Sequence, residues 1–84
     1  MRTVNRSIDI LVGAKIREIR EKNKVSKAAL ANHLSISPQQ MYKYEKGINR
    51  ISVSTLIFAC YFLRVAPQEV IGEIMKLHNM IEFI

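Results

Sequence analysis

Residue types that serve cross-linking and metal binding are scarce in this chain of 84 residues. Cys60 is the one cysteine, so the sequence excludes an internal disulfide and a thiolate cluster for zinc. His33 and His78 lack ligand-type partners at metal-site spacing, and we expect neither a metal nor a cofactor. No paired nucleophile and base and no glycine-rich phosphate loop occurs. We therefore expect no enzyme.

Long apolar segments are also absent. No apolar run is long enough to cross a bilayer, and the first residues lack the apolar core and cleavage site of a secretory signal. We therefore expect a cytoplasmic protein, since that reducing compartment also suits a lone thiol. The three glycines, two prolines and 49% hydrophobic residues are typical of an ordered globular chain. The length predicts a single domain over residues 1–84.

The positive charge is concentrated in the middle of the chain. The formal net charge is +6. Residues 22–50 contain six basic residues, Lys22, Lys24, Lys27, Lys43, Lys46 and Arg50, against the single acid Glu45. From Val65 onward, Lys76 alone faces Glu69, Glu73 and Glu82. A basic segment between neutral or acidic ones indicates a polyanionic partner, although composition alone leaves a solvated cationic surface open.

Apolar residues recur at helical spacing in five segments, which predicts an all-α fold. Residues 1–8 are expected to form a flexible arm, and Ser7 or Asp9 to cap the first helix. That helix should end near Asn23, a residue that tolerates a left-handed backbone. Ser52 is expected to cap a fourth helix. A fifth, extended helix is expected over residues 67–84.

The second and third helices form a recognisable pair. Ser26 should cap a two-turn helix over residues 27–34, and Ser37 followed by Pro38 should begin a helix that stops at Gly47. Four polar side chains cover the exposed surface of this third helix: Gln39, Gln40, Tyr42 and Lys43. A short helix, a tight turn and an exposed polar helix in a basic segment are typical of a helix-turn-helix unit.

The four polar side chains are therefore our candidates for reading DNA bases. Amides pair bidentately with adenine and lysine pairs with guanine in the major groove, which admits an exposed helix. For Tyr42, packing on the second helix is an equally good reading. Tyr44 shares the face of Met41 and is expected in the core.

At this point the chain resembles a known family, the Cro/C1-type or Xre-like helix-turn-helix regulators. The resemblance covers residues 12–70 and rests on three motifs: Gly13-x-x-Ile16-Arg17-x-x-Arg20, Ser26-x-x-x-Leu30-Ala31 and Ser37-x-x-x-Met41-x-x-x-Glu45-x-Gly47. Residues 39–52 are especially similar to a subgroup common in alphaproteobacteria. The resemblance implies a five-helix, lambda-repressor-like domain whose third helix reads bases.

Further site residues come only from this resemblance. It implies that DNA phosphates are held by Lys27, Lys46, Asn49 and Arg50. It also implies an ion pair between Arg20 of the first helix and Glu45 of the third. The chain departs from the family at Ser35 and Arg64, where members often have glycine. Pro38 departs as well and has no donor to offer a base, so base contact should begin at Gln39.

The fifth helix has more apolar residues than one small core can cover, which predicts that a partner protein covers the rest of its apolar surface. We expect a homodimer that binds a palindromic operator in double-stranded DNA, with an interface of Leu77, Ile81, Phe83 and Ile84. No small-molecule ligand is expected. A second hypothesis makes the chain an antitoxin or anti-repressor whose fifth helix binds another protein. A membrane-surface role fits less well because this helix is net acidic.

Overall fold

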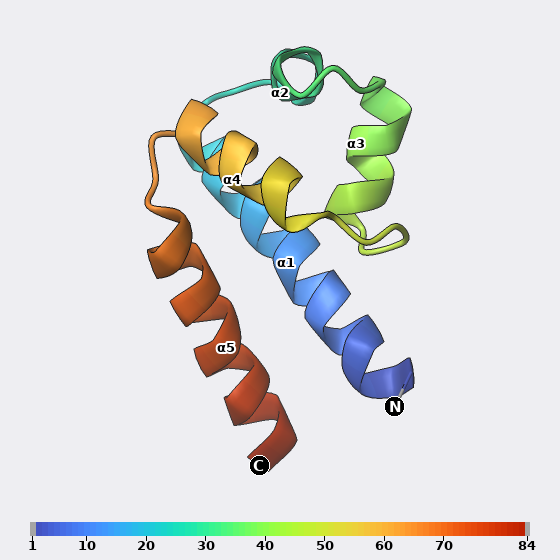
Figure 1. Ribbon diagram of the computed structural model, residues 1–84, viewed down its shortest axis with the longest axis vertical. Helices are drawn as coiled ribbons and strands as arrows, with labels where there is room; N and C mark the ends of the chain where they lie inside the picture. Colours follow the sequence, from blue (N-terminus) through green and yellow to red (C-terminus); the bar gives the residue numbers. More distant parts are fainter. Residues whose placement is uncertain (1, 84) are drawn as a thin grey trace.

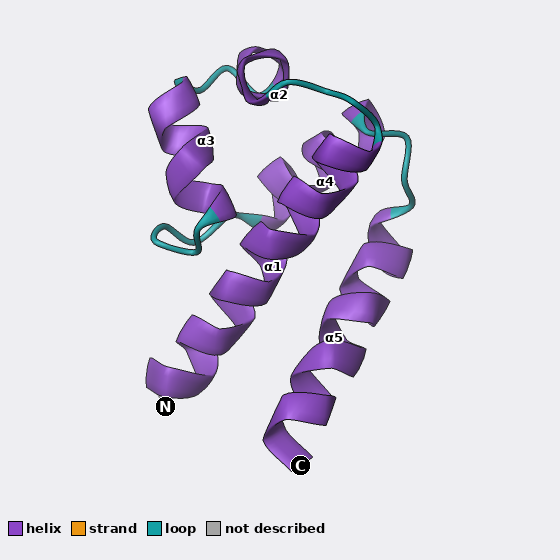
Figure 2. Cartoon of the chain, turned by 180° about the vertical axis from the view of Figure 1, so that it is seen from behind, coloured by secondary structure: helices purple, strands orange, loops and turns teal. Residues whose placement is uncertain are grey.

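The computed structural model describes the backbone of residues 2–83 and the side chains of residues 7–79. Within these bounds the chain forms five helices and no strand: α1 (Arg2–Lys22), α2 (Lys27–His33), α3 (Pro38–Glu45), α4 (Val53–Phe62) and α5 (Pro67–Phe83). The all-α, five-helix prediction is confirmed. The long helices α1 and α5 run in opposite directions and carry the two chain ends at one end of the molecule (Figure 1). Viewed from behind, α1 crosses in front of α4 (Figure 2).

Serine residues begin three of the helices as expected. The hydroxyl oxygens of Ser26, Ser37 and Ser52 accept hydrogen bonds from backbone N–H groups three residues later, at 3.0, 3.0 and 3.1 Å. Each bond satisfies one of the donors that a helix start leaves without a partner. These caps fix where α2, α3 and α4 begin, and so fix the register of the exposed face of α3.

The first four helices end in the same way. A left-handed residue follows each of them, with φ values of 58°, 59°, 72° and 60° at Lys24, Ser35, Gly47 and Arg64. The apolar residue after it donates its N–H to the carbonyl five residues earlier, at 2.9 to 3.0 Å. Glycine adopts this conformation without strain, whereas the other three residues carry a steric cost. Ser35 and Arg64, which stand where family members often have glycine, thus have left-handed backbones. At the end of α1 the left-handed residue is Lys24 and not Asn23.

The start of α1 differs from the prediction. The sequence predicts a flexible arm over residues 1–8, but α1 begins at Arg2, and residues 2–8 are helical. Val4 and Ile8 continue the apolar spacing of Val12 in the sequence, and neither glycine nor proline interrupts residues 2–12. Asp9 is therefore not a helix cap. It lies inside α1, where its carboxylate is free to bond elsewhere.

The core lies where α1, α2, α3, α4 and α5 meet. Its largest fully buried side chains come from four different helices: Ile16, Leu30, Met41 and Cys60. From α5, Val70 and Ile74 are buried in the same cluster. Burying a large apolar side chain contributes about 1.5 to 3 kcal/mol, which is what holds the two-turn helix α2 in place. Cys60 is fully buried in this cluster and is a core residue, and the burial raises the pKa of its thiol.

Candidate nucleic-acid interface

Helices α2 and α3 form a helix-turn-helix unit. α2 buries Leu30 and Ala31, and α3 buries Met41 and Glu45, so each helix has one face in the core. The turn between them passes through the left-handed Ser35 and then Ile36, whose N–H bonds to the carbonyl of Ala31 at 3.0 Å. This turn directs α3 away from α2. The opposite face of α3 is left in solvent.

The exposed face of α3 carries most of the predicted base-reading residues. Gln39 and Lys43 are exposed and lie one turn apart on the same side of the helix. Tyr42 is 46% exposed. Gln40 is half-buried, and its Oε1 accepts a hydrogen bond from Asn49 Nδ2 at 3.2 Å. That bond fixes the orientation of the Gln40 amide relative to the loop that follows α3.

The residues predicted to hold phosphates surround this face. Lys27 begins α2 and Lys46 caps the end of α3, and both ammonium groups lie over the Tyr42 ring. The guanidinium of Arg50 reaches back to α1, with Arg50 Nε 3.3 Å from a carboxylate oxygen of Asp9. The side-chain amide of Asn49 donates a hydrogen bond to Gln40. Three cationic side chains therefore lie around the exposed face of α3, namely Lys27, Lys46 and Arg50, and Lys43 lies on the face itself.

Sequence reasoning missed three of these contacts. The bond between Gln40 and Asn49 and the pair of Asp9 with Arg50 were absent from the predictions. For Tyr42, packing on α2 was one of the two readings, but the lysines that lie over its ring were not named as its partners. The helical spacing of Tyr42 and Lys46 (i and i+4) was a signal for the last of these. The other two depend on the path of residues 47–52, and no local pattern in the sequence encodes that path.

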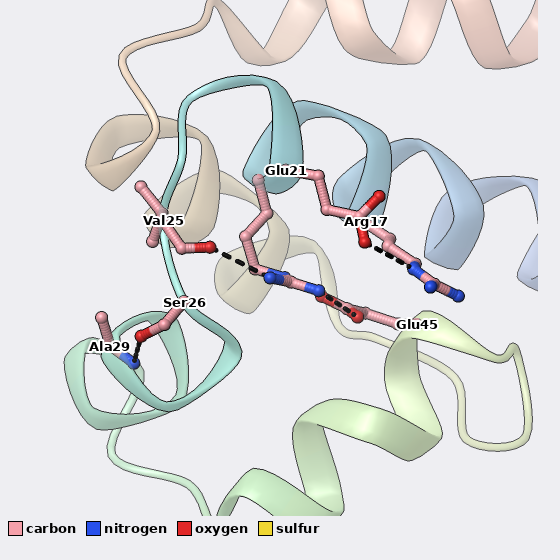
Figure 3. Close-up of polar contacts among 7 residues, drawn as sticks. Arg17, Glu21, Val25, Ser26, Ala29 and Glu45 are labelled. Carbon is pink, nitrogen blue, oxygen red and sulfur yellow. Dashed lines mark hydrogen bonds and ion pairs between the residues drawn. The ribbon is translucent and has the colours of Figure 1, made fainter.

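Arg20 and Glu45 join α1 to α3, as the resemblance implied. Arg20 Nε lies 2.6 Å from Glu45 Oε2, and Arg20 Nη2 lies 3.1 Å from Oε1, so the guanidinium binds the carboxylate in a fork. Figure 3 labels Glu45 and Val25, the two residues to which this guanidinium donates hydrogen bonds. Arg20 Nη1 also donates to the carbonyl of Val25 at 3.0 Å. The side chains are only 9% and 2% exposed. The hydrogen bond to the Glu45 carboxylate raises the pKa of Arg20.

Gly13 allows α3 to lie directly against α1. A Cβ atom built on Gly13 would stand 2.7 Å from the carbonyl oxygen of Glu45 and closer still to that of Tyr44. No ordinary side chain fits between the two backbones. The orientation of α3 is therefore determined by a close backbone contact together with the Arg20–Glu45 pair.

The predicted dimer surface is only partly described. Leu77 on α5 is 40% exposed, and Ile71 and Met75 on the same helix are 40% and 59% exposed. The side chains of Ile81 and Phe83, and all of Ile84, lie outside the described residues. Among residues 7–79, α5 thus presents three exposed large apolar side chains to solvent.

The described residues contain no group of three or more His, Cys, Asp or Glu side chains placed to hold a metal ion. None of the described helices combines the length and the hydropathy needed to span a bilayer.

Similar proteins are regulators that are longer than this chain. The chain is 40% identical over 61 residues to an uncharacterized HTH-type transcriptional regulator, y4aM, of Sinorhizobium fredii, covering 73% of this chain and 43% of that protein. It is 44% identical over 50 residues to the regulator RC0668 of Rickettsia conorii, covering 60% and 40%. The chain thus spans about two fifths of these relatives. Both sources are alphaproteobacteria, as the resemblance implied.

Solved structures share the fold. The crystal structure of the clp gene regulator ClgR from Corynebacterium glutamicum matches 87% of this chain and 78% of its own, with a TM-score of 0.80 at 23% identity. A second ClgR structure matches 82% and 90%, with a TM-score of 0.76 at 25% identity. The family described as a helix-turn-helix domain matches residues 11–71, from α1 into α5. This chain therefore belongs to the helix-turn-helix domain family, and its relatives are transcriptional regulators.

Proposed function

We propose that this chain is a sequence-specific transcriptional regulator that binds a palindromic operator in double-stranded DNA as a homodimer. The observation that carries the proposal is the exposed polar face of α3, which has a cationic rim and is held against α1 by a buried ion pair. A helix with one face in the core and a polar outer face fits the major groove. In this proposal the chain acts in the cytoplasm without catalysis, cofactor or small-molecule ligand.

Gln39 and Lys43 are the leading base readers in this proposal. Both are exposed, and neither side chain is held by a hydrogen bond or salt bridge within the described residues. Gln39 offers the paired donor and acceptor that adenine matches, and Lys43 offers donors for guanine O6 and N7. Gln40 contributes through the amide donors that its bond to Asn49 leaves available.

Phosphate contacts are proposed to position α3 without reading sequence. Lys27, Lys46, Asn49 and Arg50 lie at the two ends of the α2–α3 unit and in the loop that follows it. Arg50 is 68% exposed, so its guanidinium remains accessible to a phosphate even while it pairs with Asp9. Loss of any one of these contacts weakens binding to every sequence alike.

Competition binding tests this division of labour. A duplex selected from a random pool serves as the cognate site, and a scrambled duplex serves as the competitor. Gln39→Ala should lose about 1 to 3 kcal/mol on the cognate duplex and relax preference at one base pair. Arg50→Ala should weaken both duplexes equally and reduce the salt dependence. Lys22→Ala is the matched control, because it removes the same charge away from α3: Lys22 lines a pocket together with Glu69 and Glu73 of α5. This variant should bind both duplexes as the wild type does.

Two results would contradict the proposal. If the pool yields no enriched sequence, the chain does not read bases. If Gln39→Ala weakens both duplexes equally, α3 is not the reading helix.

Dimerisation is proposed to occur through α5. Two copies of α3 must lie about 34 Å apart to enter successive major grooves, so the half-sites should be about one turn apart. The exposed Ile71, Met75 and Leu77 supply apolar surface that a second copy would cover. Sedimentation of the full chain beside a chain truncated after Lys76 tests this role. The truncation removes Leu77 and leaves Ile71 and Met75 in place, so the truncated chain should dimerise more weakly. A full-length monomer at tens of micromolar would contradict it, and a stable complex with a different protein would favour the antitoxin or anti-repressor hypothesis.

A further inference from the structure

Two lysine side chains converge on the ring of Tyr42. Lys27 Nζ lies 5.0 Å from the ring centroid, and Lys46 Nζ lies 5.7 Å from it. Both distances fall within the range of a cation–π contact. Lys27 is the first residue of α2 and Lys46 is the C-cap of α3, so the ring joins opposite ends of the helix-turn-helix unit.

No acidic side chain compensates the charges of the two lysines on Tyr42 within the described residues. Neither Lys27 nor Lys46 takes part in a salt bridge within the described residues. Two ammonium groups drawn to one ring repel each other, and a surface lysine would ordinarily extend into solvent. An anion placed beside the two groups removes that repulsion. The cluster is therefore best satisfied when a phosphate group lies against it.

The exposure of Tyr42 fits this role better than base reading. Tyr42 is 46% exposed, and two ammonium groups already lie over its ring. Gln39 and Lys43 project from α3 without such contacts. A lysine side chain has four rotatable carbon–carbon bonds, and holding it against a ring restricts those rotations before DNA arrives.

We propose that Tyr42 is a positioning residue, whose ring holds the ammonium groups of Lys27 and Lys46 where they contact the phosphates of one DNA backbone segment. The ring faces do this work, and the hydroxyl group is dispensable. The inference rests on the proposed function and adds to it a specific task for Tyr42. It also explains why a large aromatic side chain stands half-exposed among base-reading candidates.

Two variants separate the ring from the hydroxyl group. Tyr42→Phe keeps the ring and should bind cognate and scrambled duplexes within about twofold of the wild type. Tyr42→Leu removes the ring and should weaken both duplexes by the same factor, about three- to tenfold, with a salt slope shallower by about one. In a Lys27→Ala/Lys46→Ala background, Tyr42→Leu should have no further effect, because the groups that it positions are gone.

A measurement without DNA checks the geometry itself. The ring current of Tyr42 should shift the ε-methylene protons of Lys27 and Lys46 upfield in NMR spectra of the wild type and of Tyr42→Phe, and Tyr42→Leu should lose both shifts. Thermal melts of each variant establish that the fold is retained. Unshifted lysine protons in the wild type would overturn the inference even if the protein binds DNA normally.

The binding data can also overturn the inference in two ways. If Tyr42→Phe loses the preference for the cognate duplex, the hydroxyl group reads a base and Tyr42 is not a positioning residue. If Tyr42→Leu binds both duplexes as the wild type does, the ring does not organise the lysines. A wild type that binds neither duplex would overturn the proposed function, while the proton shifts would still report on the cluster.

Discussion

Helix α1 packs against α3 on one side and α5 on another, and the two contacts differ. On the α3 side the Arg20–Glu45 side chains are 9% and 2% exposed, whereas on the α5 side those of Lys15 and Glu73 are 15% and 59% exposed. A Cβ atom on Gly13 would collide with the backbone of α3, but one on Gly72 of α5 would meet nothing within 4 Å. The helix proposed to read DNA is thus held rigidly, and the helix proposed to dimerise keeps an open face.

The largest expected effect is the loss of one partner of the buried pair. Arg20→Ala or Glu45→Ala leaves a buried charge without its partner and should lower the free energy of unfolding by about 3 kcal/mol. Urea denaturation measures this change. Arg17→Ala is the matched control, because Arg17 and Glu21 pair at 3.2 Å with side chains 47% and 54% exposed. That control should lose less than about 1 kcal/mol. Equal losses for Arg20 and Arg17 would show that burial does not distinguish the pairs.

The two glycines should respond in opposite directions. Gly13→Ala forces α1 and α3 apart and should cost about 2 kcal/mol, in the range of overpacking substitutions. Gly72→Ala adds a methyl group in open space on a helix and should gain about 0.5 to 1 kcal/mol. Thermal melts of both variants under identical conditions provide the comparison. A neutral Gly13→Ala would mean that the backbones of α1 and α3 are not in close contact.

The left-handed helix ends should give a smaller effect. Gly47 follows α3 at φ 72° and a Cβ there would contact Ile10 of α1, whereas Arg64 precedes α5 at φ 60° and is exposed. Arg64→Gly relieves a steric cost and should stabilise the fold by about 0.5 to 1 kcal/mol. Gly47→Ala should destabilise it. A shift in the denaturation midpoint of Arg64→Gly toward lower urea would contradict the strain argument.

The sequence predicted the elements better than the contacts between them. The caps at Ser26, Ser37 and Ser52 marked three helix starts because serine caps act within a single turn. The predicted start of α1 lies too late in the sequence, because Asp9 was treated as a possible helix cap. In the fold the Asp9 carboxylate accepts a hydrogen bond from Arg50 instead. Contacts across the chain depend on the path of the loops. The Arg20–Glu45 pair was anticipated from the family resemblance, and not from the spacing of residues within one helix.

The smallest effect concerns Lys15 and Glu73, the exposed pair between α1 and α5. The hydrogen bond from Lys15 lowers the pKa of the Glu73 carboxyl below its ordinary value of 4.5. A carboxyl whose pKa is lowered by folding stabilises the fold above its unfolded pKa and loses that effect as the pH falls through its folded pKa. The wild type should therefore be slightly more stable than Glu73→Gln at pH 7.

That difference should shrink as the pH falls through the lowered pKa of Glu73, because the protonated carboxyl is then neutral like the glutamine that replaces it. Thermal melts of the wild type and Glu73→Gln at pH 7 and at pH 3, each repeated in 1 M salt, test this expectation. Salt should remove most of the difference at pH 7, since screening acts strongly on a pair in solvent and weakly on a buried one such as Arg20–Glu45. If the wild type remained more stable than Glu73→Gln both at pH 3 and in 1 M salt, Glu73 would stabilise α5 through packing. The contacts of α1 with α3 and with α5 would then differ less than their ion pairs indicate.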